Sequence, residues 1–259
     1  MPRMSRKDIP KPITHFKIYG ERCSGTYLLE DTICKNFEIN YWHHKKYGHK
    51  HFLHSIDFTN SDDTLFICII RHPIKWMNSL YRTPHHLPKK MCESPENFIS
   101  HEVTAWSYNP PRMGVHCRGN QAPELKDERN PFTGEIYKNI YEMRHVKNKW
   151  MIEELPKLVK NHILIRYEDL VNDFQETMQK IKEKGLKQKD VTHEIEDMKV
   201  WMKERGDEDV DEKNFQFVQI NPNNKVRKWM KNSPCDELNI KAGDIPKEYH
   251  YYEKILGYF

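Results

Sequence analysis

The stretch "FKIYGERCSGTYLLEDTICKNF", residues 16–37, decides the fold. An apolar run ends at Gly20, a short turn leads to Gly25, and apolar residues then recur at helical spacing from Leu28 onward. A strand, a glycine-flanked turn and a helix predict an anion-binding loop. The first-turn N–H groups of a helix are unpaired, and its dipole adds positive potential. Ser24 and Thr26 add hydroxyl donors to this loop.

The same loop departs from the nucleotide-binding P-loop at its end. A Walker A sequence requires lysine at position 26 and serine or threonine at position 27. The chain has Thr26 and Tyr27 there, which removes the cation and the magnesium-binding hydroxyl. Magnesium-dependent nucleoside triphosphate chemistry is therefore not indicated. The alternative reading of the loop is a plain strand-to-helix turn capped by Ser24.

Composition narrows the class of protein. The 259 residues suit one large domain, and a mean hydropathy of −0.90 with 31% charged residues indicates a thick polar surface. The longest apolar run, 65–70, is too short to cross a bilayer. The N-terminus lacks an apolar signal core, and the six cysteines form no C-x-x-C pair, so we expect a reduced, cytoplasmic protein.

The charge balance points to a small anionic ligand. The chain has 42 Lys and Arg against 38 Asp and Glu, a net charge of +4. This excess is modest, and acidic residues lie among the basic ones throughout. We therefore expect no nucleic-acid partner.

Strand and helix patterns alternate along the chain, which predicts a parallel α/β sheet. Residues 1–12 are expected to form a flexible lead, and residues 13–259 a single domain. The segment 83–135 is too long for an ordinary connection and is expected to cover an active site or receive an acceptor. The expected strands are 14–20, 64–70 and 162–170; the expected helices include 25–37, 71–82, 95–107, 135–155, 222–231 and 246–256.

A second candidate anion site lies in "IIRHPIKWMNSLYR", residues 69–82. Arg71 ends an apolar strand, and Ser79 follows eight residues later on the helix side. A guanidinium and a hydroxyl suit a phosphomonoester, because arginine makes bidentate contacts with phosphate oxygens. The alternative is that Arg71 pairs with a neighbouring carboxylate and Ser79 is a surface residue.

Together the two loops resemble those of the 3′-phosphoadenosine-5′-phosphosulfate (PAPS)-dependent sulfotransferases. "GERCSGTYLL" is similar to that family's 5′-phosphosulfate loop, and "RHPIKWMNS" to its 3′-phosphate motif, including the spacing from arginine to serine. "LIRYEDL" resembles the strand that follows, and the closing "YYEKILGYF" resembles the C-terminal helix of many members. The likeness covers most of the chain in order and is thin across 83–135.

The resemblance implies a P-loop NTPase-like fold, a three-layer α/β/α arrangement with a central parallel sheet. It implies PAPS as donor, adenosine 3′,5′-bisphosphate as product, no metal, and in-line transfer of a sulfuryl group to a hydroxyl or amine. The implied acceptor is a small molecule, a carbohydrate or a peptide. The implied donor-binding residues are Arg22, Cys23, Ser24, Gly25, Thr26, Tyr27, Arg71, Ser79 and Tyr167, with Arg227 and Lys228 as a late basic grip on the 3′-phosphate.

Two of these assignments have plainer alternatives. Tyr167, which the resemblance places near the adenine, can equally be a core tyrosine beside the charge pair Arg166–Glu168. Arg227 and Lys228 can equally belong to an ordinary charged helix face.

One position departs from the family. Many members carry a lysine directly before Ser-Gly-Thr, where it assists the leaving group, and this chain has Cys23 there. A thiol cannot take that role. Our hypothesis is that the adjacent Arg22, which is always charged, stabilises the bridging oxygen electrostatically.

The base that accepts the acceptor's proton is expected in the histidine-rich stretch 42–54, where the family often has Lys-x-His at the end of its second strand. His51 is the first candidate and His49 the second, with Lys50 as a nearby donor. Glu102 and Glu30 stay open as bases. The histidines can also form a solvated loop, or hold a metal if His49 and His51 project to one side of a strand.

Three functions compete at this point. A PAPS-dependent sulfotransferase accounts for both loops. A kinase or other nucleotide phosphotransferase on a related fold is disfavoured by Thr26 and Tyr27. A non-catalytic nucleotide-binding protein is kept open by Cys23.

Overall fold

The computed structural model describes residues 11–43, 46–53, 56–82, 84, 86–106, 124–125, 128–194 and 238–259. The predicted helix 222–231, and with it Arg227 and Lys228, lies outside these residues, as does most of the predicted flexible lead.

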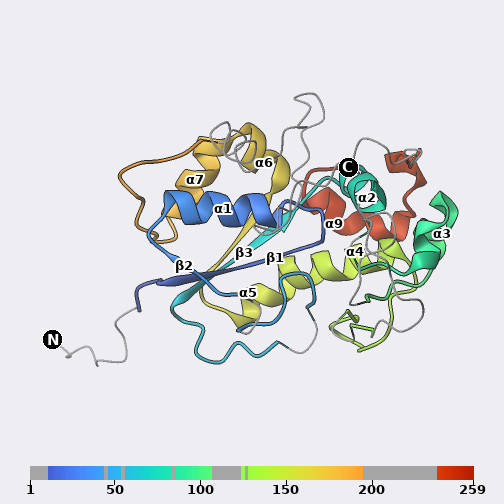
Figure 1. Cartoon of the computed structure of the whole chain (residues 1–259), viewed down its shortest axis with the longest axis horizontal. Helices are drawn as coiled ribbons and strands as arrows, with labels where there is room; N and C mark the ends of the chain where they lie inside the picture. The colour runs from blue at the N-terminus through green and yellow to red at the C-terminus, as the bar shows by residue number, and fades with distance from the viewer. Residues whose placement is uncertain are drawn as a thin grey trace, which may run out of the picture.

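A parallel sheet lies at the centre of the fold (Figure 1). Its strands are β1 (His15–Gly20), β2 (Asn40–Tyr41), β3 (Thr64–Ile70) and β4 (His162–Arg166), in the order β2-β1-β3-β4. All three pairings are parallel. The predicted parallel α/β sheet is therefore confirmed. The predicted strand 162–170 is too long, because the chain turns into helix directly after Arg166.

Helices cover both faces of the sheet (Figure 1). On one face α1 (Thr26–Asn36), α6 (Tyr167–Asn172) and α7 (Phe174–Lys182) share a core with Ile18 and Ile67. On the other face the π-helical turn Trp150–Glu154 and α5 (Leu155–Leu158) pack on Tyr19 and Phe66. Because successive strand residues point to opposite faces, the wholly buried β3 is covered on both sides; β1 is buried from Phe16 to Gly20 and includes the charged Lys17.

The long helix predicted over 135–155 is divided. Its α-helical part, α4 (Ile140–Lys149), begins only after Asn139, whose side chain accepts a hydrogen bond from the Glu142 N–H at 2.8 Å. The π-helical turn then leads into α5, which contains Pro156. Proline supplies no N–H to a helix, and a change of hydrogen-bond period accommodates it.

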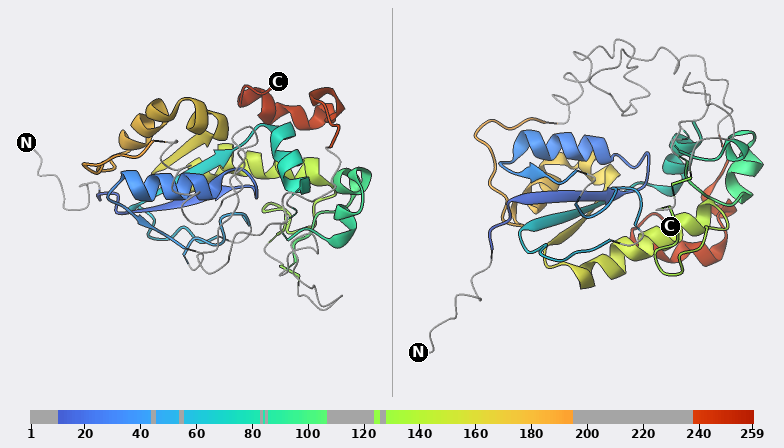
Figure 2. Two further views of the ribbon diagram at one scale, coloured as in Figure 1. Left: turned by 45° about the horizontal axis from the view of Figure 1, so that its top comes forward. Right: turned by 60° about the horizontal axis from the view of Figure 1, so that its bottom comes forward.

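A third core cluster lies beyond the carboxyl ends of the strands, where α2 (Pro73–Arg82), α3 (Pro95–Ser100) and α9 (His250–Ile255) gather around the first turns of α4 (Figure 2). It contains side chains from three parts of the chain: Trp76 and Leu80 on α2; Leu87, Met91, Phe98 and Val103 in the segment 83–135; and Leu238 and Ile245 near the C-terminus. Within the segment 83–135, the described residues of this cluster thus pack at the edge of the sheet where the predicted loops lie.

Two helix predictions need correction. The helix expected over 95–107 has six residues, capped by the Ser94 hydroxyl, and ends at Ser100. The chain then runs in extended conformation and forms isolated bridges, including Val103 with Tyr137. The helix expected over 246–256 consists of a 3₁₀ turn, Lys247–Tyr249, followed by α9. Among the described helices, none combines the length and apolar character that crossing a bilayer requires.

Replacing Gly25 tests how tightly the first loop packs. Gly25 has φ 95°, and a Cβ atom there would lie 2.4 Å from the Tyr167 Cδ2 atom. We expect Gly25→Ala to lower the free energy of unfolding by roughly 2–4 kcal/mol, from backbone strain plus overlap. Gly185 has φ 93° and open space around it, so Gly185→Ala should cost only the strain, about 1–2 kcal/mol. Urea denaturation compares the two variants, and equal losses would contradict the close Tyr167 contact.

Candidate functional site

The first loop delivers the N-terminus of α1 to the carboxyl edge of the sheet. Gly25 is the N-cap residue, and no side chain caps the helix. The N–H groups of the first turn have no partner within a helix, so they form a ready anion site at the edge where parallel α/β sheets bind ligands. Of the two residues that replace the Walker lysine and hydroxyl, Thr26 is buried and Tyr27 is exposed.

Ser24 shapes this loop from within. Its hydroxyl donates to the Glu21 carbonyl at 2.6 Å, and its N–H donates to the same carbonyl at 3.1 Å. The hydroxyl therefore closes the turn, and the alternative in which Ser24 caps the helix is wrong. The cap position belongs to Gly25 because its left-handed backbone starts the helix directly after the turn.

The second loop meets the first one through Arg71. Its Nη1 donates to the Cys23 carbonyl at 3.1 Å, and its guanidinium lies 4.6 Å from the centre of the Tyr167 ring. Arg71 Nε is buried and has no hydrogen-bond partner among the described residues. The alternative in which Arg71 pairs with a neighbouring carboxylate does not appear, because its described contacts are a carbonyl and an aromatic ring. A guanidinium with an unused donor suits an anion.

Tyr167 and Ser79 complete this side of the site. The Tyr167 ring packs against Gly25 on one side and Arg71 on the other, so it lies between the two loops. Ser79 is buried, and it hydrogen-bonds the Cys23 thiol. The structure thus brings together Cys23, Gly25, Arg71, Ser79 and Tyr167, which the sequence predicted from three separate motifs.

The Cys23 thiol stays protonated. Burial raises its pKa to about 11, although Arg71 and the Ser79 hydrogen bond act in the opposite direction. Cys23 also has a left-handed backbone, with φ 64°. A thiol in this state is neither a nucleophile nor a charge partner for an anion.

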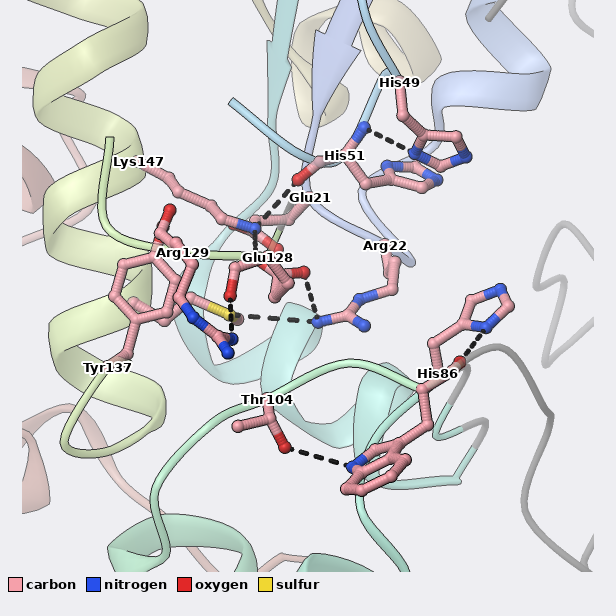
Figure 3. A network of polar contacts seen from close by, with 12 residues as sticks. Glu21, Arg22, His49, His51, His86, Thr104, Glu128, Arg129, Tyr137 and Lys147 are labelled. Atoms are coloured by element: carbon pink, nitrogen blue, oxygen red, sulfur yellow. Dashed lines mark hydrogen bonds and ion pairs between the residues drawn. The ribbon is translucent and has the colours of Figure 1, made fainter. Parts of the chain in front are cut away.

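The Arg22 side chain points into a buried ion network (Figure 3). Its Nη2 lies 3.1 Å from Glu128 Oε2, and its guanidinium is 2% exposed. Glu128 also pairs with Lys147, which lies 3.2 Å from Glu21 Oε1. Burial raises the pKa of Glu21, and the Lys147 ammonium opposes that shift. The predicted role of Arg22 at a bridging oxygen thus concerns a guanidinium that already has a buried carboxylate partner.

His51 lies beside the end of β1. Its Nδ1 is 2.6 Å from the Gly20 carbonyl, and because a carbonyl only accepts, Nδ1 carries the proton. Nε2 then holds the free lone pair. Burial, followed by neighbouring cationic groups, lowers the pKa of His51 well below its usual 6.5. The imidazole is therefore neutral near pH 7 and in the tautomer that a general base at Nε2 requires.

The surroundings of His51 differ from the prediction. His49 accepts a hydrogen bond at Nδ1 from the His51 N–H at 3.3 Å and stacks on Phe52. Lys50 pairs with Glu30 at 3.2 Å and lies over the Tyr27 ring. Residues 49–51 form a turn and not the end of a strand, so the expectation that His49 and His51 share one side of a strand is wrong. In the described part of the chain, no group of three or more His, Cys, Asp or Glu side chains could hold a metal ion.

Sequence reasoning missed the side chains that hold the site in place. Arg144 on α4 pairs with Glu253 on α9 and donates to the Arg71 carbonyl at 2.8 Å. Glu168 accepts from the His72 N–H at 3.0 Å and from the Tyr258 hydroxyl at 2.8 Å. These contacts join residues 73 or more positions apart, and a lone charged residue in a sequence does not identify such a partner.

A further histidine also escaped notice. His86, in the segment 83–135, has its Nδ1 2.7 Å from the Trp106 carbonyl, which fixes the same tautomer as in His51. Burial lowers its pKa. Figure 3 shows His86 near the Arg22 side of the network. The His86 backbone is left-handed, with φ 59°, and the sequence does not predict this conformation for a histidine.

Comparisons of the chain with protein-family models, with curated proteins and with solved structures found no match. The described fold is a parallel α/β fold with helices on both faces of the sheet, and the candidate site combines an uncapped helix N-terminus at the carboxyl edge of the sheet with a neutral histidine beside it.

His51 should make stability depend on pH. Its pKa is lowered on folding, so the unfolded chain binds its proton first as the pH falls below 6.5. The contribution of neutral His51 to the free energy of unfolding is fully present above pH 6.5. It decreases below pH 6.5, by up to about 1.4 kcal/mol per pH unit. We expect His51→Gln to lose less stability than wild type between pH 6.5 and about pH 5 in urea titrations. Contributions from other histidines cancel in this comparison, and parallel curves would contradict the assignment.

Proposed function

We propose that this protein transfers a sulfuryl group from PAPS to a hydroxyl or amine acceptor. One observation carries the proposal: Arg71 of the second loop donates to the Cys23 carbonyl of the first, and the Tyr167 ring lies close to both Arg71 and Gly25. The residues that resemble a 5′-phosphosulfate loop, a 3′-phosphate motif and an adenine-side tyrosine therefore form one continuous surface.

The residues present fit a bisphosphorylated nucleoside. The uncapped N-terminus of α1 offers N–H donors to the 5′ side of such a donor. Arg71 offers its unused Nε, and Ser79 a hydroxyl, to the 3′-phosphate. Tyr167 offers a ring face near both loops. These groups can hold two separate anionic positions without a Walker lysine.

Charge on the leaving phosphate is stabilised mainly by backbone donors in this proposal. Cys23 remains a neutral thiol, and the Arg22 guanidinium is balanced by Glu128. The N–H groups at the start of α1 are preorganised by the Ser24 turn and point at the developing charge. Arg22 adds positive potential from one residue before Cys23, in keeping with our hypothesis, and does not donate a proton.

His51 serves as the general base. Its Nε2 lone pair takes the proton from the acceptor as the acceptor oxygen or nitrogen bonds to sulfur. The bond between sulfur and the bridging oxygen breaks, and that oxygen leaves on adenosine 3′,5′-bisphosphate. The Gly20 carbonyl holds the proton on Nδ1 and stabilises the imidazolium that forms. The segment 83–135, packed at the same edge, is the place for the acceptor.

Ligand binding distinguishes this proposal from a phosphotransferase. Adenosine 3′,5′-bisphosphate should raise the melting temperature, because a ligand of the native state alone stabilises it; at 100-fold excess over Kd the gain is about 2.7 kcal/mol. ATP with magnesium should give a much smaller shift. Thermal denaturation with each ligand measures this. A shift with ATP and none with the bisphosphate would support a phosphotransferase and overturn the proposal.

Arg71 should recognise the 3′-phosphate specifically. Loss of a charge-assisted contact predicts that Arg71→Ala binds adenosine 3′,5′-bisphosphate roughly 10- to 100-fold more weakly. Binding of adenosine 5′-phosphosulfate, which lacks the 3′-phosphate, should change little. Lys75→Ala, which removes an exposed cation from α2, the helix that follows Arg71, is the matched control and should bind both ligands like wild type. Calorimetric titration measures both constants, and equal weakening for the two ligands would refute the 3′-phosphate role.

A further inference from the structure

Lys147 on α4 is the meeting point of three other segments. Its ammonium is buried and lies 3.2 Å from Glu21 Oε1, after β1. It pairs with Glu128 Oε1, in the segment 83–135, and donates to the His51 carbonyl at 2.9 Å. Figure 3 shows the Lys147 side chain reaching from α4 into the middle of this group.

The charges in this buried network balance. Two carboxylates, Glu21 and Glu128, face two cations, Lys147 and Arg22, and all four side chains are at most 3% exposed. A buried charge is costly unless it is paired, so removing one member leaves its neighbours uncompensated. Glu128 is central, because one of its oxygens contacts Lys147 and the other Arg22.

The hydrogen bond from Lys147 fixes the backbone that carries His51. Two other bonds dock the same turn onto β1: the Gly20 N–H donates to the Lys50 carbonyl at 3.0 Å, and His51 Nδ1 donates to the Gly20 carbonyl. In both of these bonds the partner on β1 is Gly20. Lys147 supplies the third contact from another layer of the fold, and this contact holds the turn from the side of α4.

We propose that Lys147 is the positioning residue for His51, and that Glu128 completes its charge balance from the segment 83–135. This inference rests on the proposed function, in which His51 is the base. Its consequence is that the segment assigned to the acceptor also orients the base. The imidazole is held with Nε2 free when Glu128 is docked against Lys147 and Arg22, so acceptor binding and base positioning share one buried contact.

The test measures the tautomer of His51 by ¹⁵N NMR of the imidazole at neutral pH, with His51→Gln identifying the signal. Wild type should show the Nδ1–H tautomer. Lys147→Met removes the donor to the His51 carbonyl and should reduce the Nδ1–H fraction several-fold, whereas Lys147→Arg should restore most of it. Glu128→Gln should give an intermediate loss. Lys157→Met removes an exposed lysine farther along the same helical run and should match wild type.

An unchanged tautomer in folded Lys147→Met would overturn the inference. If Lys147→Met does not fold, Glu128→Gln takes its place, because glutamine has nearly the same shape as glutamate. An unchanged His51 tautomer in folded Glu128→Gln would then overturn the inference. The measurement needs no donor, so it separates this inference from the proposed function. A change in tautomer without any binding of adenosine 3′,5′-bisphosphate would contradict the function alone. Where turnover is measured, Lys147→Met should lower kcat while leaving the Kd of the bisphosphate unchanged.

Discussion

The ammonium of Lys147 between Glu21 and Glu128 is the interaction on which the rest of the site depends. Charges buried this deeply are stable only in pairs, so the loop after β1, the helix α4 and the segment 83–135 must be assembled together. The His51 turn is tied to the same ammonium through its carbonyl. The candidate base, the loop after β1 and Glu128 of the segment 83–135 are therefore coupled by one charge balance.

A second constraint acts at the other side of the loop. In the proposed function, a helix N-terminus takes the first anion position in place of a lysine, and an arginine beside the Tyr167 ring takes the second. Neither group requires a metal ion to hold an anion. Arg144 donates a hydrogen bond to the Arg71 carbonyl, and Glu168 accepts one from the His72 N–H. These two bonds hold the backbone of the second loop in place. The first candidate position thus consists of backbone N–H groups, whereas the second consists of a side chain whose own backbone is held by other elements.

Features that depend on nearby residues were predicted from the sequence more accurately than features that depend on residues far apart in the chain. The run 64–70 identified β3 to the residue, because a strand buried on both faces is apolar throughout. The helix expected over 95–107 failed, since its extent depends on the Ser94 cap and on the extended pairing of Val103 with Tyr137. Arg71 and Ser79 were found by spacing, whereas Glu128 gave no signal, because its partners lie about a hundred residues away or outside any motif.

By itself the sequence determined the parallel α/β sheet, the glycine turn before α1 and the residue types at both anion positions. These follow from local periodicity and from the backbone freedom of glycine, which short stretches encode. Only the tertiary structure decided which side chains share a site. It turned Arg22 toward Glu128, placed Tyr167 between the two loops and set the tautomer of His51 through the Gly20 carbonyl. The physical reason is that pairing and burial of polar groups depend on neighbours that only folding brings together.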